Sequence, residues 1–372
     1  MKLGILCTMI NGFGRRGYYN SQEIGLGRAL ARKGHEVMIY KGIDPSEKEE
    51  KVQVEKNLTI WYLPMKHLGA HGFMDCKNLD PQLKALFCFG DQQIFLPHVY
   101  RWCRRRRIPF VAYVGTAHSL DSNFKSKVMN ALFAAGTLRI YKKNPVLAKT
   151  SAAKEELRQL GIPHAVIAPV GLDTAVLKKN IPADEKMRLR KEHGFEADDV
   201  ILCNVSRLSW EKRPLELIDL FLQVKGKKKF KLIIVGNGPL EEELNEKIRK
   251  NGLEKEVKIY PNVPYEKMWE IYEMSDHYLN MNKGEIFGMA IMEAVYYKTS
   301  VAAIRALGPS VTLKDMKGHK LCENDDEMAE WITGPYPSEK DLQESSEKMA
   351  ATFTWDRCAD AFLQASSEKS SR

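Results

Sequence analysis

The chain has 372 residues, 44% hydrophobic and 28% charged, so it can form two domains with cores of their own and has the composition of an ordinary globular protein. No apolar run approaches the roughly 20 residues that a membrane-spanning helix needs. The seven cysteines are scattered and form no cluster with histidines at metal-ligand spacing, which argues against structural zinc and for reduced thiols in a cytoplasmic protein.

The formal net charge of +9 is distributed unevenly. Residues 1–170 contain 26 Lys and Arg against 13 Asp and Glu, whereas the other 202 residues contain 31 against 35. A basic first half is expected to meet an anionic partner, such as a phosphorylated or lipid-linked acceptor or an anionic lipid surface. Nucleic acid is not expected, because no known nucleic-acid-binding motif is present.

The N-terminal segment has the pattern of a strand, a glycine-rich turn and a helix. A strand is expected from Lys2 to Met9, a helix ends at Gly34, and the next strand runs from His35 to Tyr40. Between them, Gly12-x-Gly14-x-x-Gly17 matches the dinucleotide fingerprint. That fingerprint also requires an acid at the end of the second strand, where this chain has Lys41. An NAD(P)-dependent oxidoreductase therefore remains as an alternative function.

Further strands are expected at residues 57–63, 84–89, 109–114 and 144–150. A helix from Pro97 to Arg107 ends in four consecutive arginines, with Arg101 one turn back. Such a run compensates a helix dipole, but it also suits anionic lipid or an acceptor phosphate. His118 follows the strand at 109–114, at the edge where ligands of α/β sheets bind, although a lone histidine also suits a structural role.

The turn from Pro169 to Asp173 marks a domain boundary, so we expect domains at 1–171 and 172–352 and a C-terminal helical segment at 353–372. The second domain should contain strands at 200–205, 231–235, 257–260 and 277–281. Polar and glycine motifs follow the ends of these strands. They are Arg207 with Lys212, Gly236 with Gly238, and Glu285 with Glu293.

These residue types suit a sugar diphosphate. Arg207 and Lys212 could stabilise the charge that grows on a leaving diphosphate without a metal ion. A helix that begins near Gly288 would leave Glu285 just before its N-terminus and carry Glu293 about one and a half turns into it. Two glutamates around an amphipathic helix also fit a solvated surface, so the neighbouring motifs decide the interpretation.

In this order, the Arg-x4-Lys, Val-Gly-x-Gly-Pro and Glu-x7-Glu motifs resemble those of retaining GT-B glycosyltransferases of the GT4 type (glycosyl transferases group 1), which use nucleotide sugars. The resemblance implies an α/β fold of two doubly wound Rossmann-like domains that face a cleft, with a C-terminal helix that crosses back to the first domain. It implies a hexosyltransferase (EC 2.4) that uses a nucleotide sugar, by the family's habit a UDP-sugar. The acceptor would belong to cell-surface polysaccharide, glycolipid or other glycoconjugate biosynthesis. A non-catalytic sugar-binding protein of the same fold is a further alternative.

The resemblance also implies roles for individual residues. Glu285, His118, Lys212 and Arg207 would be catalytic, with the two cations on the diphosphate and Glu293 on the ribose. The other donor-binding residues would be Gly17, Gly236, Asn262, Val263, Ile286, Phe287, Gly288 and Met289. Acceptor-binding residues would be Tyr18, Asn20 and His118. No cofactor or metal is expected, and the enzyme should be cytoplasmic, with peripheral contact at the inner membrane face through Arg101–Arg107.

Overall fold

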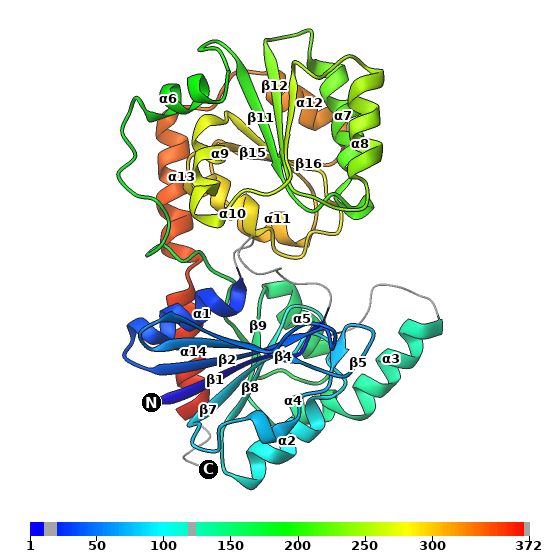
Figure 1. Ribbon diagram of the computed structural model, residues 1–372, viewed down its shortest axis with the longest axis vertical. Helices are drawn as coiled ribbons and strands as arrows, with labels where there is room; N and C mark the ends of the chain where they lie inside the picture. The colour runs from blue at the N-terminus through cyan, green and yellow to red at the C-terminus, as the bar shows by residue number, and fades with distance from the viewer. Residues whose placement is uncertain (11–20, 118–123, 368–372) are drawn as a thin grey trace. The chain divides into compact units, whose positions relative to one another are not determined.

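The computed structural model describes residues 1–10, 21–117 and 124–367. The chain divides into two compact units. The first contains the described residues up to Asp173 together with those from Phe353 onwards, and the second is Thr174–Thr352. Each unit is built on a mainly parallel sheet with helices on both faces, as Figure 1 shows for each unit separately.

The first unit has an eight-stranded sheet in which β3 alone runs antiparallel, at one edge. In spatial order its strands are β10 (Val166–Ile167), β9 (Val146–Ala148), β8 (Phe110–Val114), β7 (Ala85–Phe89), β1 (Lys2–Cys7), β2 (Glu36–Ile43), β4 (Leu58–Pro64) and β3 (Glu50–Glu55). A separate hairpin pairs β5 (His67–Leu68) with β6 (His71–Gly72). Its helices are α1 (Gln22–Arg32), α2 (Leu96–Arg105), α3 (Phe124–Ala135), α4 (Thr137–Tyr141), α5 (Ser151–Gln159) and α14 (Trp355–Ser367).

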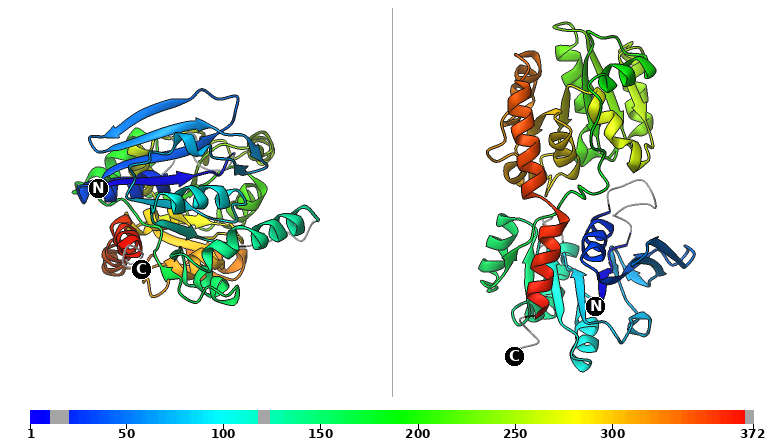
Figure 2. Two further views of the ribbon diagram at one scale, coloured as in Figure 1. Left: turned by 90° about the horizontal axis from the view of Figure 1, so that it is seen from below. Right: turned by 90° about the vertical axis from the view of Figure 1, so that its left-hand side faces the viewer.

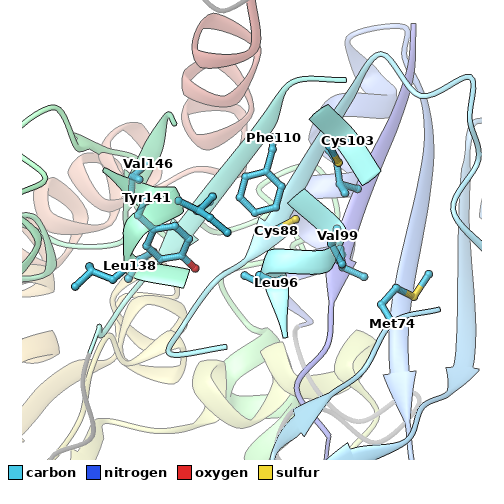
Figure 3. Packing of buried hydrophobic residues seen from close by; sticks show 14 of the residues in the cluster. Met74, Cys88, Leu96, Val99, Cys103, Phe110, Leu138, Tyr141 and Val146 are labelled. Carbon is cyan, nitrogen blue, oxygen red and sulfur yellow. The ribbon is translucent and has the colours of Figure 1, made fainter. Parts of the chain in front are cut away.

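Central strands of this sheet are almost entirely buried, as expected of parallel strands that are covered on both faces. Every residue of β8 is buried, and alternate side chains serve opposite faces. On one face the side chains of β7, β8 and β9 pack against α2, α4 and α5. Figure 3 shows part of this core, where Val99 and Cys103 of α2 lie beside Phe110, and Tyr141 of α4 lies beside Val146.

The last helix, α14, covers the other face of the first sheet. Figure 2 shows it running across the sheet beside α1. Phe362 meets Phe87 of β7 edge to face, with ring centroids 5.2 Å apart. Gly25 of α1 lies so close to Trp355 that a Cβ atom there would be 2.2 Å from the indole nitrogen. The C-terminal helix is thus an integral part of the first unit.

The turn that was expected to end the first domain packs against the segment that returns to it. Leu172 forms a parallel bridge with Thr354. A Cβ atom at Gly171 would lie 2.1 Å from the carbonyl carbon of Thr354, so only glycine fits at this crossing. Asp173 is buried and accepts a hydrogen bond from Arg32 of α1 at 2.9 Å. Gly171 and Asp173 therefore have a structural role at the domain boundary.

The second unit has a six-stranded parallel sheet in the order β13 (Val257–Tyr260), β12 (Phe230–Val235), β11 (Val200–Val205), β14 (His277–Asn280), β15 (Ser300–Ile304) and β16 (Lys320–Cys322). One face packs against α7 (Pro214–Val224), α8 (Glu241–Lys250) and α12 (Asp325–Thr333). The remaining helices are α6 (Glu185–Glu192), α9 (Met268–Met274), α10 (Met289–Tyr296), α11 (Leu307–Thr312) and α13 (Glu339–Thr352). Both units are thus doubly wound Rossmann-like domains.

Candidate active site

The order of strands in the second sheet identifies the edge where a ligand would bind. The chain starts at β11, adds β12 and β13 on one side, and then returns to add β14, β15 and β16 on the other. The topological switch point therefore lies between β11 and β14. In open α/β sheets, ligands bind at this point, outside the carboxyl ends of the strands. The loops that leave β11 after Val205 and β14 after Asn280 carry two of the predicted motifs.

Lys212 and Glu285 meet between these two loops. Lys212 ends a short 3₁₀ turn, Trp210–Lys212, and its Nζ donates to Oε2 of Glu285 at 2.8 Å. The two side chains are 24% and 15% exposed. The side-chain amide of Asn282 also donates to Glu285 at 3.1 Å. Residues 73 positions apart in the sequence thus converge on one partly buried charged pair.

The surroundings of Glu285 keep it ionised. Burial raises the pKa of its carboxyl group, but the charge and hydrogen bond of Lys212, with hydrogen bonds from Asn282 and Asn280, outweigh burial and hold the pKa below its ordinary value. The site therefore offers a fixed carboxylate and a fixed ammonium group side by side, both reachable from solvent.

The glycines after β12 bring a second turn into contact with the loop of Lys212. A Cβ atom at Gly236 would lie 1.9 Å from the carbonyl oxygen of Ser206, and one at Gly238 would lie 2.4 Å from that of Leu208. Gly236 also has φ +144, which L side chains rarely adopt. The peptide N–H of Leu208 donates to the carbonyl of Asn237 at 2.9 Å. Gly236 and Gly238 therefore allow the turn after β12 to pack directly against the backbone of the loop that carries Lys212.

A left-handed glycine joins Glu285 to helix α10. Gly288 has φ +84 and ψ +65 and precedes Met289, the first residue of the helix. Ile286 is 38% exposed, whereas Phe287 is buried. Gly308 of α11 packs on Phe287, because a Cβ atom there would lie 2.5 Å from its peptide nitrogen, and the N–H of Gly308 donates to the carbonyl of Glu285 at 2.8 Å. The segment before α10 is thus fixed by backbone contacts.

The other predicted donor-binding residues differ in exposure. Glu293 lies inside α10, is buried and accepts a hydrogen bond from the Tyr272 hydroxyl at 2.8 Å. Arg207 is half-exposed and forms an ion pair with Glu211 of its own loop at 2.9 Å. Unlike Lys212, it is therefore not paired with Glu285 in the structure. Asn262 and Val263 follow β13, and Asn262 accepts from the Asn237 side chain at 2.8 Å.

Comparisons with known proteins agree with this arrangement. Residues 185–348, which include Lys212, Glu285 and Glu293, match the model of the family "Glycosyl transferases group 1". A D-inositol 3-phosphate glycosyltransferase of Xylanimonas cellulosilytica is 23% identical over 97% of this chain and 94% of its own length. The match of the second unit and the likeness of the whole chain to a named glycosyltransferase together support a GT-B glycosyltransferase of group 1.

Solved structures of the same fold cover nearly the whole glycosyltransferase. Sucrose-phosphate synthase from Thermosynechococcus elongatus has a TM-score of 0.73 at 16% identity and covers 99% of this chain and 98% of its own. Alr3699/HepE from Anabaena, solved in complex with UDP and glucose, has a TM-score of 0.71 at 17% identity, with 100% of both chains covered.

Two buried residues of the first unit argue against the alternative function, an NAD(P)-dependent oxidoreductase. Gly12, Gly14 and Gly17 lie outside the described residues. Glu23 stands in the first turn of α1, where a dinucleotide would place its pyrophosphate. Lys41 stands two residues before the end of β2, near the position where an acid would hold the ribose. Both side chains are buried and pair with each other. A bound pyrophosphate would face this carboxylate.

Of the predicted acceptor-side residues, Tyr18, Asn20 and His118 also lie outside the described residues. The carboxyl ends of neighbouring strands in this unit hold a polar group that sequence reasoning missed. Asp91 follows β7, pairs with Lys149 after β9, and accepts the peptide N–H groups of Gly115 and, at 3.2 Å, Thr116 after β8. An aspartate and a lysine 58 positions apart form no sequence motif, so only the sheet topology reveals this pair.

The basic run of the glycosyltransferase lies away from these strand ends. Helix α2 ends at Arg105, two residues earlier than expected, and Arg107 has φ +58 in the following turn. Arg101 and Arg104–Arg107 are exposed. They precede β8, so they lie at the amino edge of the sheet, opposite the edge where ligands bind. Among the described residues, no helix is both long enough and apolar enough to cross a membrane.

Proposed function

We propose that this enzyme transfers a sugar from a uridine diphosphate sugar and retains the anomeric configuration. The observation that carries the proposal is the Lys212–Glu285 pair, 2.8 Å across, at the switch point of the second sheet. The bound UDP and glucose of the structurally similar Anabaena protein are consistent with such a donor.

In the proposed reaction, the acceptor oxygen bonds to the anomeric carbon as the bond from that carbon to the diphosphate breaks, and the hydroxyl proton passes to the leaving diphosphate. Negative charge grows on the leaving diphosphate, and Lys212 stabilises that charge in a partly buried site where its effect is larger than in water. Glu285 and the peptide N–H groups of Phe287, Gly288 and Met289 contact the donor sugar, and Glu293 holds the ribose. Arg207 turns from Glu211 to the diphosphate when the donor binds.

We further propose an anionic acceptor, in the biosynthesis of a polysaccharide, glycolipid or other glycoconjugate. Residues 1–170 contain twice as many basic as acidic residues. The similar protein from Xylanimonas cellulosilytica is named for a phosphorylated acceptor, D-inositol 3-phosphate. Electrostatic attraction by a basic domain is screened by salt. The KM for a phosphorylated acceptor should therefore rise with ionic strength more steeply than the KM for its unphosphorylated analogue.

A binding and activity panel tests the donor. Thermal shifts with uridine, guanosine and adenosine diphosphates select the base, and the corresponding sugars are then assayed for transfer. Lys212→Ala and Glu285→Gln should each abolish transfer and leave the melting temperature within a few degrees, and Lys250→Ala, which removes an exposed lysine of α8, is the matched control. Full activity of either site variant would exclude the role proposed for that residue.

Proton NMR of the product measures its anomeric configuration, and an inverted anomer would exclude the retaining mechanism.

Two further expectations belong to this proposal. Transfer should need no metal ion, because Lys212 supplies a cation, so activity should survive EDTA. Loss of activity in EDTA that is restored by Mg²⁺ or Mn²⁺ would contradict this expectation.

Surface contact with anionic lipid through Arg101 and Arg104–Arg107 should make the protein sediment with vesicles containing phosphatidylglycerol. Changing Arg104 and Arg105 to glutamine should weaken this binding and leave transfer to a soluble acceptor unchanged, and undiminished sedimentation contradicts the contact.

A further inference from the structure

Arg213, which follows Lys212, has an unusual backbone conformation. Its φ of +56 and ψ of +47 lie in the left-handed region, directly before Pro214 begins α7. A residue with a Cβ atom pays roughly 1–2 kcal/mol for this conformation, whereas glycine adopts it freely. An arginine at such a position suggests that its side chain makes contacts that offset the strain.

The guanidinium group of Arg213 makes three sets of contacts. It binds both carboxylate oxygens of Asp325, at 3.0 and 2.7 Å, in the fork-to-fork geometry that only arginine offers. It also donates to Glu216 of α7 at 3.3 Å and to the carbonyl oxygen of Met281 at 3.4 Å. Asp325 is the first residue of α12, a helix that packs against the sheet of the second unit. Asp325 thus anchors the Arg213 guanidinium group to the core of that unit.

These contacts join the two loops of the candidate active site. Arg213 is the next residue after Lys212 on the loop from β11, and Met281 lies four residues before Glu285 on the loop from β14. The guanidinium group therefore connects, through one side chain, the two segments whose charged groups meet 2.8 Å apart. Its side chain is only 16% exposed, so water competes little for these bonds.

We propose that Arg213 is a positioning residue that, anchored on Asp325, holds Lys212 and Glu285 in the geometry required for transfer. This inference rests on the proposed function of that pair. In this proposal Arg213 acts through the two loops and not by contact with donor or acceptor. Its removal allows the two loops to move relative to each other, and a displacement of about 1 Å at a reacting group can lower the rate about 100-fold.

Four variants test the proposal. Arg213→Gly removes the guanidinium group and also relieves the left-handed backbone, so its melting temperature should stay within a few degrees. Arg213→Lys keeps the charge but loses the fork, and Asp325→Asn weakens the anchor without touching the loop. All three should lower kcat at least fivefold, and Arg213→Gly at least tenfold, with a smaller, several-fold rise in the donor KM. Arg188→Ala, which removes an arginine paired with Glu185 on α6, should leave kcat unchanged.

A double-mutant comparison separates positioning from a general loss of structure. In the otherwise unchanged enzyme, Arg213→Gly should weaken the affinity for uridine diphosphate several-fold. In a protein that already carries Lys212→Ala, adding Arg213→Gly should cause no further loss, because both changes act through the ammonium group of Lys212. If Arg213→Gly does not fold, Asp325→Asn and Arg213→Lys decide by the same measurements. The proposal is overturned if the variants keep kcat within twofold, or if the losses of Arg213→Gly and Lys212→Ala simply add. Full activity of Lys212→Ala and Glu285→Gln would instead reject the proposed function of the pair.

Discussion

Replacing Lys212 by methionine tests whether this lysine controls the charge of Glu285. A charge-assisted hydrogen bond between partly buried groups contributes about 1.5–3 kcal/mol to stability. With Lys212 present, the pKa of Glu285 lies below its ordinary value of 4.5, although burial alone raises it. Without Lys212, burial has less to oppose it, and the pKa of Glu285 should rise. We therefore expect Lys212→Met to lower the free energy of unfolding by about 1.5–3 kcal/mol at pH 7.

The sign of the pH dependence follows from linkage. A carboxyl group whose pKa is lower in the folded than in the unfolded state stabilises the fold above its ordinary pKa, and that contribution disappears as the pH falls through the folded-state pKa. Lys212→Met should thus differ most from the unchanged protein at neutral pH, and the difference should shrink from pH 5 downwards.

Urea unfolding at pH 7, 5 and 4 measures this difference. The matched control is Lys250→Met, which breaks an ion pair with Glu246 that has the same 2.8 Å separation but is 72% and 54% exposed. Because solvent screens an exposed pair, the control should lose much less stability. The reasoning is refuted if both variants cost the same at pH 7, or if the cost of Lys212→Met is constant down to pH 4.

Three further substitutions test other parts of the structure. Gly236→Ala should force the loop at Ser206 away and weaken uridine diphosphate binding at least tenfold by titration calorimetry; unchanged affinity contradicts the contact. Phe362→Ala should cost about 3–5 kcal/mol and lower the calorimetric transition of the first unit by roughly 10 °C, and a shift in the second unit instead would show that α14 is misplaced. Tyr272→Phe removes a hydrogen bond to buried Glu293 and should cost about 1.5–3 kcal/mol by chemical denaturation; no measurable loss would argue against that bond.

The buried strands and their motifs were readable from the sequence. Mainly apolar runs between polar turns predicted β11 and β13 with their observed bounds, and the end of β14 and the start of α10 within one residue. Because motif residues at the carboxyl ends of parallel strands share one edge of a sheet, the approach of Lys212 to Glu285 could be anticipated as well. The roles of all the predicted site residues, including Arg207, Glu293, Asn262 and Val263, stay predictions.

Elements without an apolar pattern were missed. Strand β3 is mostly charged and exposed, and α13 buries only Leu342, Ser345 and Met349 along 14 residues, so neither carries a strong periodic signal. The pair of Arg213 with Asp325 joins positions 112 residues apart, and its existence depends on where α12 begins in three dimensions. Sequence reasoning also left residues 305–310 unassigned, where backbone contact between Gly308 and Phe287 determines the path of the chain.

The placement of α14 has a consequence for synthesis on the ribosome. Domains commonly fold in the order in which they emerge. Here the described residues of the second unit form one continuous stretch, whereas the first unit needs residues from Phe353 onwards to cover the aromatic side chains Phe87 and Tyr113. The half that is made first is therefore completed last. Until residues 353–367 have been made, nascent chains leave this aromatic sheet face uncovered, so we expect them to aggregate more readily when translation stalls before that point.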